Sequence, residues 1–145
     1  WVAAPCWAAV HRSVPDSLPV CAAHPLSVAV AAALGFPDAF YDSLLGEYRE
    51  RRGAITAGLF DCGFDGRAPD GAYYVMAGIR RFGFDDDVAF ARHLIEKVAV
   101  ATVPASSFFH DPALGKSQVR FSFPQRMETL NRGLDSLRAL SPASS

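Results

Sequence analysis

The segment QVRFSF, residues 118–123, alternates polar and apolar side chains. Successive side chains of a strand point to opposite faces, so Val119, Phe121 and Phe123 share one face of a predicted strand. A second strand is predicted for AYYVMAGI, residues 72–79, which is aromatic and β-branched. Each strand has an apolar side that the rest of the chain must cover.

Helical patterns surround these strands. Apolar side chains recur at three- or four-residue multiples and predict a long helix ending at Gly63, through Phe40, Leu44, Tyr48, Ile55, Leu59 and Cys62. Three more helices are expected: a short buried one over Pro25 to Leu34, one from near Asp85 that buries Val88, Ala91, Leu94, Ile95 and Val98, and one over Met127 to Leu140. The run 98–103 is expected to be another buried strand. The fold class is therefore α+β, a small and mostly antiparallel sheet covered by helices.

Composition excludes several functional classes. The chain has 145 residues, is 50% hydrophobic and carries a formal net charge of -1, which fits one soluble domain and no nucleic-acid partner. No apolar run reaches the roughly 20 residues that cross a bilayer, so no membrane partner is expected. Three irregularly spaced cysteines, Cys6, Cys21 and Cys62, predict neither a disulfide framework nor a zinc site. They favour a reducing intracellular compartment, the cytoplasm.

Arg120 is the candidate binding residue. Alternation places it on the strand face opposite Val119 and Phe121, where a guanidinium can hold a carboxylate through two parallel hydrogen bonds. The pattern alone also describes an arginine on a solvated strand face, and without further information it favours this simpler interpretation. The two lysines, Lys97 and Lys116, lie in contexts that do not suggest a Schiff base.

Five segments, taken in order, resemble class I/II aminotransferases of pyridoxal-phosphate (PLP) fold type I, in the branch similar to kynurenine, glutamine and methionine aminotransferases. The segments are WVAAP at 1–5, YRERR at 48–52, PDGAYY at 69–74, VPASSFF at 103–109 and QVRFSF at 118–123. They run through nearly the whole chain. The chain also begins without an initiator Met, as an internal segment of a longer protein would.

The resemblance implies a carboxy-terminal small domain. Residues 1–24 would be the end of a large domain and the connection from it, 25–140 the small domain, and 141–145 a disordered tail. Arg120 would bind the substrate α-carboxylate in a PLP-dependent transfer of an amino group between an amino acid and a 2-oxo acid. The Schiff-base lysine would lie outside this chain, which is then expected to be inactive by itself and to bind no PLP tightly. The parent protein would be a homodimer.

Two other functions share this fold in resembling proteins. One is a carbon–sulfur lyase that uses PLP, and the other is a non-catalytic, ligand-sensing domain of a transcriptional regulator. Two departures from the family pattern bear on substrate preference. Ala105 stands where glycine is common, and alanine does not share glycine's freedom to adopt a positive φ. Gly78 stands where aspartate is frequent.

Overall fold

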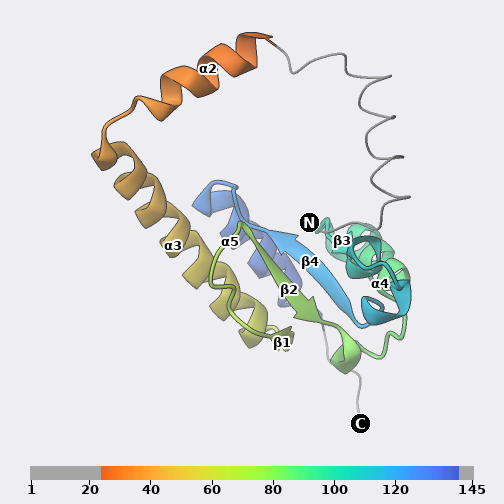
Figure 1. The fold of residues 1–145 in the computed structure, drawn as a ribbon. Coiled ribbons are helices and arrows are strands. Elements are labelled where there is room, and N and C mark those ends of the chain that lie inside the picture. Colours follow the sequence, from red (N-terminus) through yellow and green to blue (C-terminus); the bar gives the residue numbers. More distant parts are fainter. Residues whose placement is uncertain (1–23, 141–145) are drawn as a thin grey trace, which may run out of the picture. The chain divides into compact units, whose positions relative to one another are not determined.

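The structure, a computed structural model, describes residues 24–140 of the chain (Figure 1). Two compact units divide the chain, one formed by residues 1–42 and the other by residues 43–145. The expectations for Cys6, Cys21, the segment 1–5 and the tail 141–145 lie outside the described residues.

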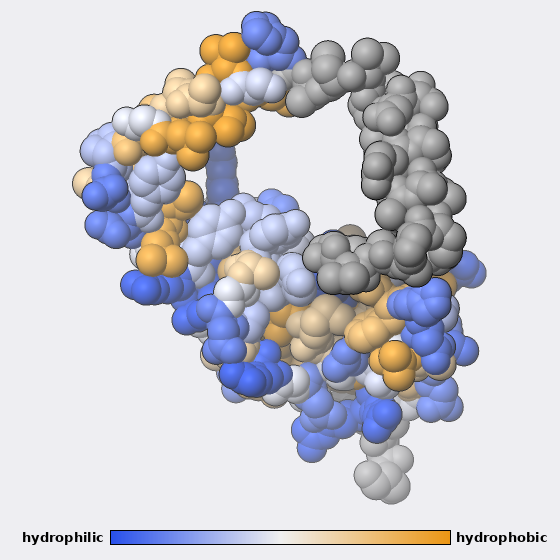
Figure 2. Space-filling view, in the orientation of Figure 1, coloured by the Kyte–Doolittle hydropathy of each residue, from blue (hydrophilic) through white to orange (hydrophobic). Residues whose placement is uncertain are grey.

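The first unit contains helix α2, His24–Leu34. Its bounds agree with the predicted helix, and the chain leaves it at Gly35, whose N–H donates to the carbonyl of Ala32 at 3.1 Å. The predicted burial is wrong, because no residue of α2 is buried and its large apolar side chains are between 55 and 76% exposed. Figure 2 shows these apolar side chains along its surface. Apolar composition favours burial of a helix, but it does not itself provide a partner.

Helix α3, Asp38–Asp61, confirms the long predicted helix. Gly63 follows it with a left-handed φ of 91°, a conformation that glycine adopts without strain. The apolar stripe is buried only toward the carboxyl end, at Ile55 and Leu59, whereas Phe40 and Leu44 are 46 and 41% exposed.

The second unit is built on a four-stranded antiparallel sheet with the strand order β1-β2-β4-β3. The strands are β1 Asp65–Gly66, β2 Tyr74–Gly78, β3 Val103–Pro104 and β4 Gln118–Ser122. The two long strands are the predicted ones, and they pair with Met76 opposite Arg120. The predicted α+β class with a small antiparallel sheet is confirmed.

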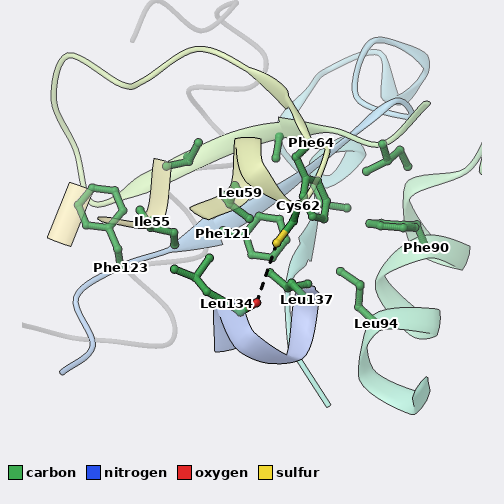
Figure 3. Close-up of a cluster of buried hydrophobic side chains, with 14 of the residues drawn as sticks. Ile55, Leu59, Cys62, Phe64, Phe90, Leu94, Phe121, Phe123, Leu134 and Leu137 are labelled. Carbon is green, nitrogen blue, oxygen red and sulfur yellow. Dashed lines mark hydrogen bonds between the residues drawn. The ribbon is translucent and has the colours of Figure 1, made fainter. Parts of the chain in front are cut away.

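Helices cover one face of this sheet, and Figure 1 shows α5, Met127–Leu137, behind β2 and β4. The buried face of the strands presents Val75, Val119 and Phe121 to the end of α3 and to α5. Figure 3 shows side chains of α3, β4 and α5 meeting around Cys62. Each fully buried large apolar side chain contributes about 1.5–3 kcal/mol, so this one-sided core is what holds the sheet.

Helix α4, Asp87–His93, begins as predicted, because the carboxylate of Asp86 accepts the N–H of Ala89 at 2.8 Å and caps it. A π-helical turn, Leu94–Val98, then breaks the helical period. Ile95, in this turn, is 55% exposed, so its predicted burial is wrong. Val88 is also exposed, at 47%, whereas the predicted burial of Leu94 is confirmed.

The predicted strand at 98–103 is wrong for most of its length. Ala99 ends the π-helical turn in a left-handed conformation with a φ of 59°, and pairing starts only at Val103. The N–H of Val100 donates to the carbonyl of Leu94 at 3.1 Å, so the backbone is still closing the helical turn where a strand was expected. An apolar run of this length does not by itself distinguish a strand from a helix end.

Candidate functional site

Arg120 lies in the middle of β4, on the sheet face opposite the helices. Its chain neighbours Val119 and Phe121 are 0 and 5% exposed in the core, which confirms the predicted alternation. Met76 of β2 and Val103 of β3 stand opposite Arg120 on the two flanking strands. β4 lies between β2 and β3, so the guanidinium rises from an inner strand and not from an edge of the sheet.

Two aromatic rings flank this guanidinium. The Cζ atom of Arg120 lies 4.2 Å from the ring centroid of Phe108 and 5.1 Å from that of Tyr74. Tyr74 comes from β2, and Phe108 ends a single 3-10 turn, Ala105–Phe108, that follows β3. Each such cation–ring contact is worth about 0.5–2 kcal/mol. Arg120 is half-buried beside these rings, so its guanidinium is only partly solvated.

Arg120 is half-buried, and its polar contacts can be followed within residues 24–140. Within residues 24–140 its buried Nε has no hydrogen-bond partner, and no carboxylate lies within 4.0 Å of its guanidinium. The other half-buried arginines are satisfied: Arg51 pairs with Glu47 at 2.7 Å, and Arg52 donates to the carbonyl of Pro69 at 3.1 Å. A charge partly removed from water gains from an anion that restores its hydrogen bonds. The arrangement can therefore receive a carboxylate from outside.

Phe108, at the end of the 3-10 turn, was not predicted as a residue of the site. Ala105 begins this turn fully buried and is not among the described residues with positive φ, so alanine in place of glycine introduces no backbone strain there. Phe108 lies in the family-like segment VPASSFF, but the pattern of that segment does not indicate a contact with Arg120 on β4.

The loop after this turn offers no acid–base pair. The carboxylate of Asp111 accepts the N–H of Ala113 at 3.0 Å and caps a short 3-10 turn, Pro112–Leu114. His110 is exposed. The neighbouring tyrosines differ, because Tyr73 is 52% exposed and only Tyr74 contacts Arg120.

A hollow of about 540 Å³ lies on the helical side of the sheet. Its wall is mostly apolar, with Ile55 and Leu59 from α3 and Leu130 from α5, and Arg132 is its charged residue. Phe121 contributes from β4, whereas Arg120 is not part of the wall. The hollow is therefore separate from the Arg120 site and contains no acid–base pair.

The buried thiol of Cys62 is part of the core. Its Sγ lies 3.9 Å from the carbonyl oxygen of Leu134 (Figure 3). Burial raises the pKa of the Cys62 thiol, nearby Arg138 opposes this, and Asp61 adds to it. A neutral, buried thiol is a poor nucleophile and a poor metal ligand.

Residues 24–140 offer neither a metal site nor a single membrane-spanning helix. In that part of the chain, no group of three His, Cys, Asp or Glu side chains is placed to hold a metal ion. No single helix there is long and apolar enough to cross a bilayer, and only α2 and α3 taken together, across the break between them, reach the required length and composition.

Comparison with known proteins identifies the family. The family model for aminotransferase class I and II matches residues 1–137. The chain belongs to this family. It is 38% identical over 125 residues to the Mycobacterium tuberculosis protein named Probable N-succinyldiaminopimelate aminotransferase DapC, covering 80% of this chain and 31% of that protein. It is 32% identical over 109 residues to the aspartate aminotransferase of Thermotoga maritima, covering 75% of this chain and 26% of that enzyme.

A solved structure agrees with this membership. N-succinyldiaminopimelate aminotransferase from Mycobacterium tuberculosis superposes with a TM-score of 0.77 at 35% identity, covering 90% of this chain and 34% of that one. The chain thus spans about a third or less of the length of the relatives it matches. The agreement covers the α+β fold described above.

PLP, the cofactor implied by the resemblance, needs a lysine placed in a binding site. The chain has two lysines, Lys97 and Lys116, and both are exposed. Neither lines the hollow. The residues described here therefore do not fit this cofactor.

Proposed function

We propose that this chain is the carboxy-terminal part of a PLP-dependent aminotransferase and that Arg120 binds the α-carboxylate of the substrate. The protein would transfer an amino group between an amino acid and a 2-oxo acid. The observation that carries the proposal is the half-buried guanidinium of Arg120, which rises from a rigid strand beside two aromatic rings and has no anionic partner among residues 24–140.

The chemistry of Arg120 fits this role. A planar guanidinium accepts a carboxylate in a two-pronged geometry that fixes both the position and the rotation of the bound group. The rings of Tyr74 and Phe108 restrict the guanidinium before the substrate arrives, so less conformational entropy is lost on binding. Binding the α-carboxylate in one orientation also fixes the directions of the bonds at the neighbouring α-carbon, where transamination takes place.

The names of the relatives support transfer of an amino group over the lyase and sensing alternatives. Relatives from Mycobacterium tuberculosis, Thermotoga maritima and Dictyostelium discoideum are named for transamination with N-succinyldiaminopimelate, aspartate and kynurenine. These substrates differ in their side chains and share the α-amino carboxylate. The shared group is the one that we assign to Arg120.

The chain supplies only one wall of the proposed site. Because neither Lys97 nor Lys116 lies in a binding site, the lysine that would hold PLP belongs to residues outside this chain. We therefore propose that the 145-residue chain is inactive by itself and does not hold PLP tightly. A stable imine absorbance from the isolated chain mixed with PLP would contradict this.

The decisive experiment uses the natural polypeptide that contains this sequence. It is supplied with PLP, an amino-acid donor and a 2-oxo acid, and the new amino acid is measured. Loss of charge-assisted hydrogen bonds worth about 1.5–3 kcal/mol should make Arg120→Ala about 10- to 100-fold worse in kcat/KM. The matched control is Arg51→Ala, which removes another half-buried arginine, one that already pairs with Glu47.

The outcomes separate the candidate functions. Transfer that is impaired by Arg120→Ala and spared by Arg51→Ala supports the proposal. Release of ammonia and a keto acid without an acceptor would instead establish the lyase. Substrate binding without turnover would favour the sensing domain, and equal effects of the two substitutions would remove Arg120 from the site.

A further inference from the structure

The 3-10 turn Ala105–Phe108 is fixed by neighbours on two sides. The N–H of Ser106 donates to Oδ2 of Asp87 at 2.7 Å, across 19 positions of sequence. On another side lies Gly115, where a Cβ would overlap the backbone of Ala105 and Ser106. The turn is therefore held by one carboxylate and by one close backbone approach.

This turn places an aromatic ring on Arg120. Phe108 is its last residue, and the ring centroid lies 4.2 Å from Cζ of Arg120. Phe108 is 50% exposed, so packing does not enclose its ring. The position of the ring consequently depends on the backbone of the turn, and thus on the bond between Ser106 and Asp87.

Asp87 is not needed to start its own helix. The preceding residue, Asp86, already caps α4 by accepting the N–H of Ala89 at 2.8 Å. Asp87 is only 1% exposed, and within residues 24–140 its Oδ1 has no hydrogen-bond partner. Burial of a polar group with incomplete hydrogen bonding costs about 1–3 kcal/mol. A carboxylate retained under that cost points to a role in the one bond it does form.

We propose that Asp87 is a positioning residue for the Arg120 site. By fixing Ser106, it fixes the turn, and through Phe108 it orients the guanidinium of Arg120 before a carboxylate binds. This inference rests on the proposed function, because it assumes that Arg120 receives the substrate carboxylate. A guanidinium held in its binding orientation loses less freedom on binding, and a looser one binds the same anion more weakly.

The test is a double-mutant cycle in the natural polypeptide, with KM for the amino-acid donor and kcat measured separately. We expect Asp87→Ala to raise KM on the order of tenfold, because a less restricted guanidinium binds the carboxylate more weakly. In an Arg120→Ala background, the same substitution should change KM by less than about twofold, because the group that it positions is gone.

Two further variants distinguish positioning from simple destabilisation. Asp86→Ala is the matched control: it removes a neighbouring carboxylate that caps the same helix but does not contact the turn, and it should raise KM by less than about twofold. Asp87→Asn keeps an oxygen that can accept from Ser106, and it should restore KM to within about threefold of the wild type. If circular dichroism shows that Asp87→Ala does not fold, Asp87→Ser replaces it. The serine hydroxyl is compatible with the start of a helix but is too short to accept the N–H of Ser106.

The results can overturn the positioning role of Asp87 without overturning the proposed function. A KM that rises with Arg120→Ala but not with Asp87→Ala would refute positioning and leave the proposed function intact. Equal effects of Asp87→Ala in both backgrounds, or an equal effect of Asp86→Ala, would also refute it. A KM that does not respond to Arg120→Ala would refute the proposed function first, and the positioning role with it.

Discussion

Two glycines of helix α3 should respond with opposite signs to the same substitution. Gly53 is exposed, and a Cβ built there meets no atom within 4 Å. At Gly58 a Cβ would lie 2.5 and 2.7 Å from the two Cδ atoms of Leu134 on α5. Gly58 therefore marks the place where α3 and α5 approach each other closely.

The magnitudes follow from this difference. Replacement of glycine by alanine inside a helix stabilises it by about 0.5–1 kcal/mol, and Gly53→Ala should show this gain in full. Gly58→Ala has the same gain but must displace Leu134, and overpacking of this kind costs about 1–3 kcal/mol. We expect the free energies of unfolding of the two variants to differ by about 1–3 kcal/mol, with Gly53→Ala the more stable.

The assay is urea unfolding of the 145-residue chain, followed by circular dichroism. A third variant provides the internal check: in a Leu134→Ala background the obstructing atoms are absent, so Gly58→Ala should become stabilising by about 0.5–1 kcal/mol. If Gly58→Ala is as stabilising as Gly53→Ala in the wild-type background, α3 and α5 do not pack at Leu134 as described.

Further predictions concern the core, the thiol and the site. Leu59→Ala should lower the free energy of unfolding in urea by about 2–5 kcal/mol, because Leu59 is fully buried, whereas Leu44→Ala on the same helix, 41% exposed, should cost well under half of that. Burial raises the pKa of the Cys62 thiol in the folded state, so the neutral thiol stabilises the fold fully below its unfolded pKa of about pH 8.5. This stabilisation is lost as the pH rises through the folded-state pKa. The free energy of unfolding, measured from about pH 7 to 10, should therefore fall with pH in the wild type, and Cys62→Ala should lack this fall. Phe108→Ala should raise KM for the amino-acid donor about 2- to 30-fold by removing one ring contact from Arg120, and an unchanged KM would show that the ring does not hold the guanidinium.

The sequence predicts those elements in which apolar side chains recur at the spacing of a strand or a helix. The alternation of Val119, Phe121 and Phe123 is sufficient for β4, and the spacing of Ile55 and Leu59 is sufficient for the buried end of α3. These patterns are local, so they can be recognised without knowledge of the partner. By contrast, strand β1 has only two residues within a cluster of turn residues, and it exists because its partner strand is adjacent.

The errors share one physical cause, because each depended on contacts that local sequence does not specify. The apolar helix α2 has the composition of a buried helix but is exposed in this chain. The left-handed Ala99 ends a π-helical turn within what looks like a strand. At the site, the alternation of β4 places Arg120 on the face away from the core. Phe108 contacts Arg120 from the 3-10 turn, and Asp87 of α4 holds that turn through the N–H of Ser106. Neither contact is visible in the local sequence.

The central claim is that Arg120 receives the α-carboxylate of an amino-group donor. The most direct measurement compares, in the natural polypeptide with PLP, an amino acid with the corresponding amine that lacks the carboxylate. The wild type should prefer the amino acid, and Arg120→Ala should reduce that preference in kcat/KM by about 10- to 100-fold, while Arg51→Ala leaves it unchanged. A preference that survives Arg120→Ala intact would mean that the carboxylate binds elsewhere.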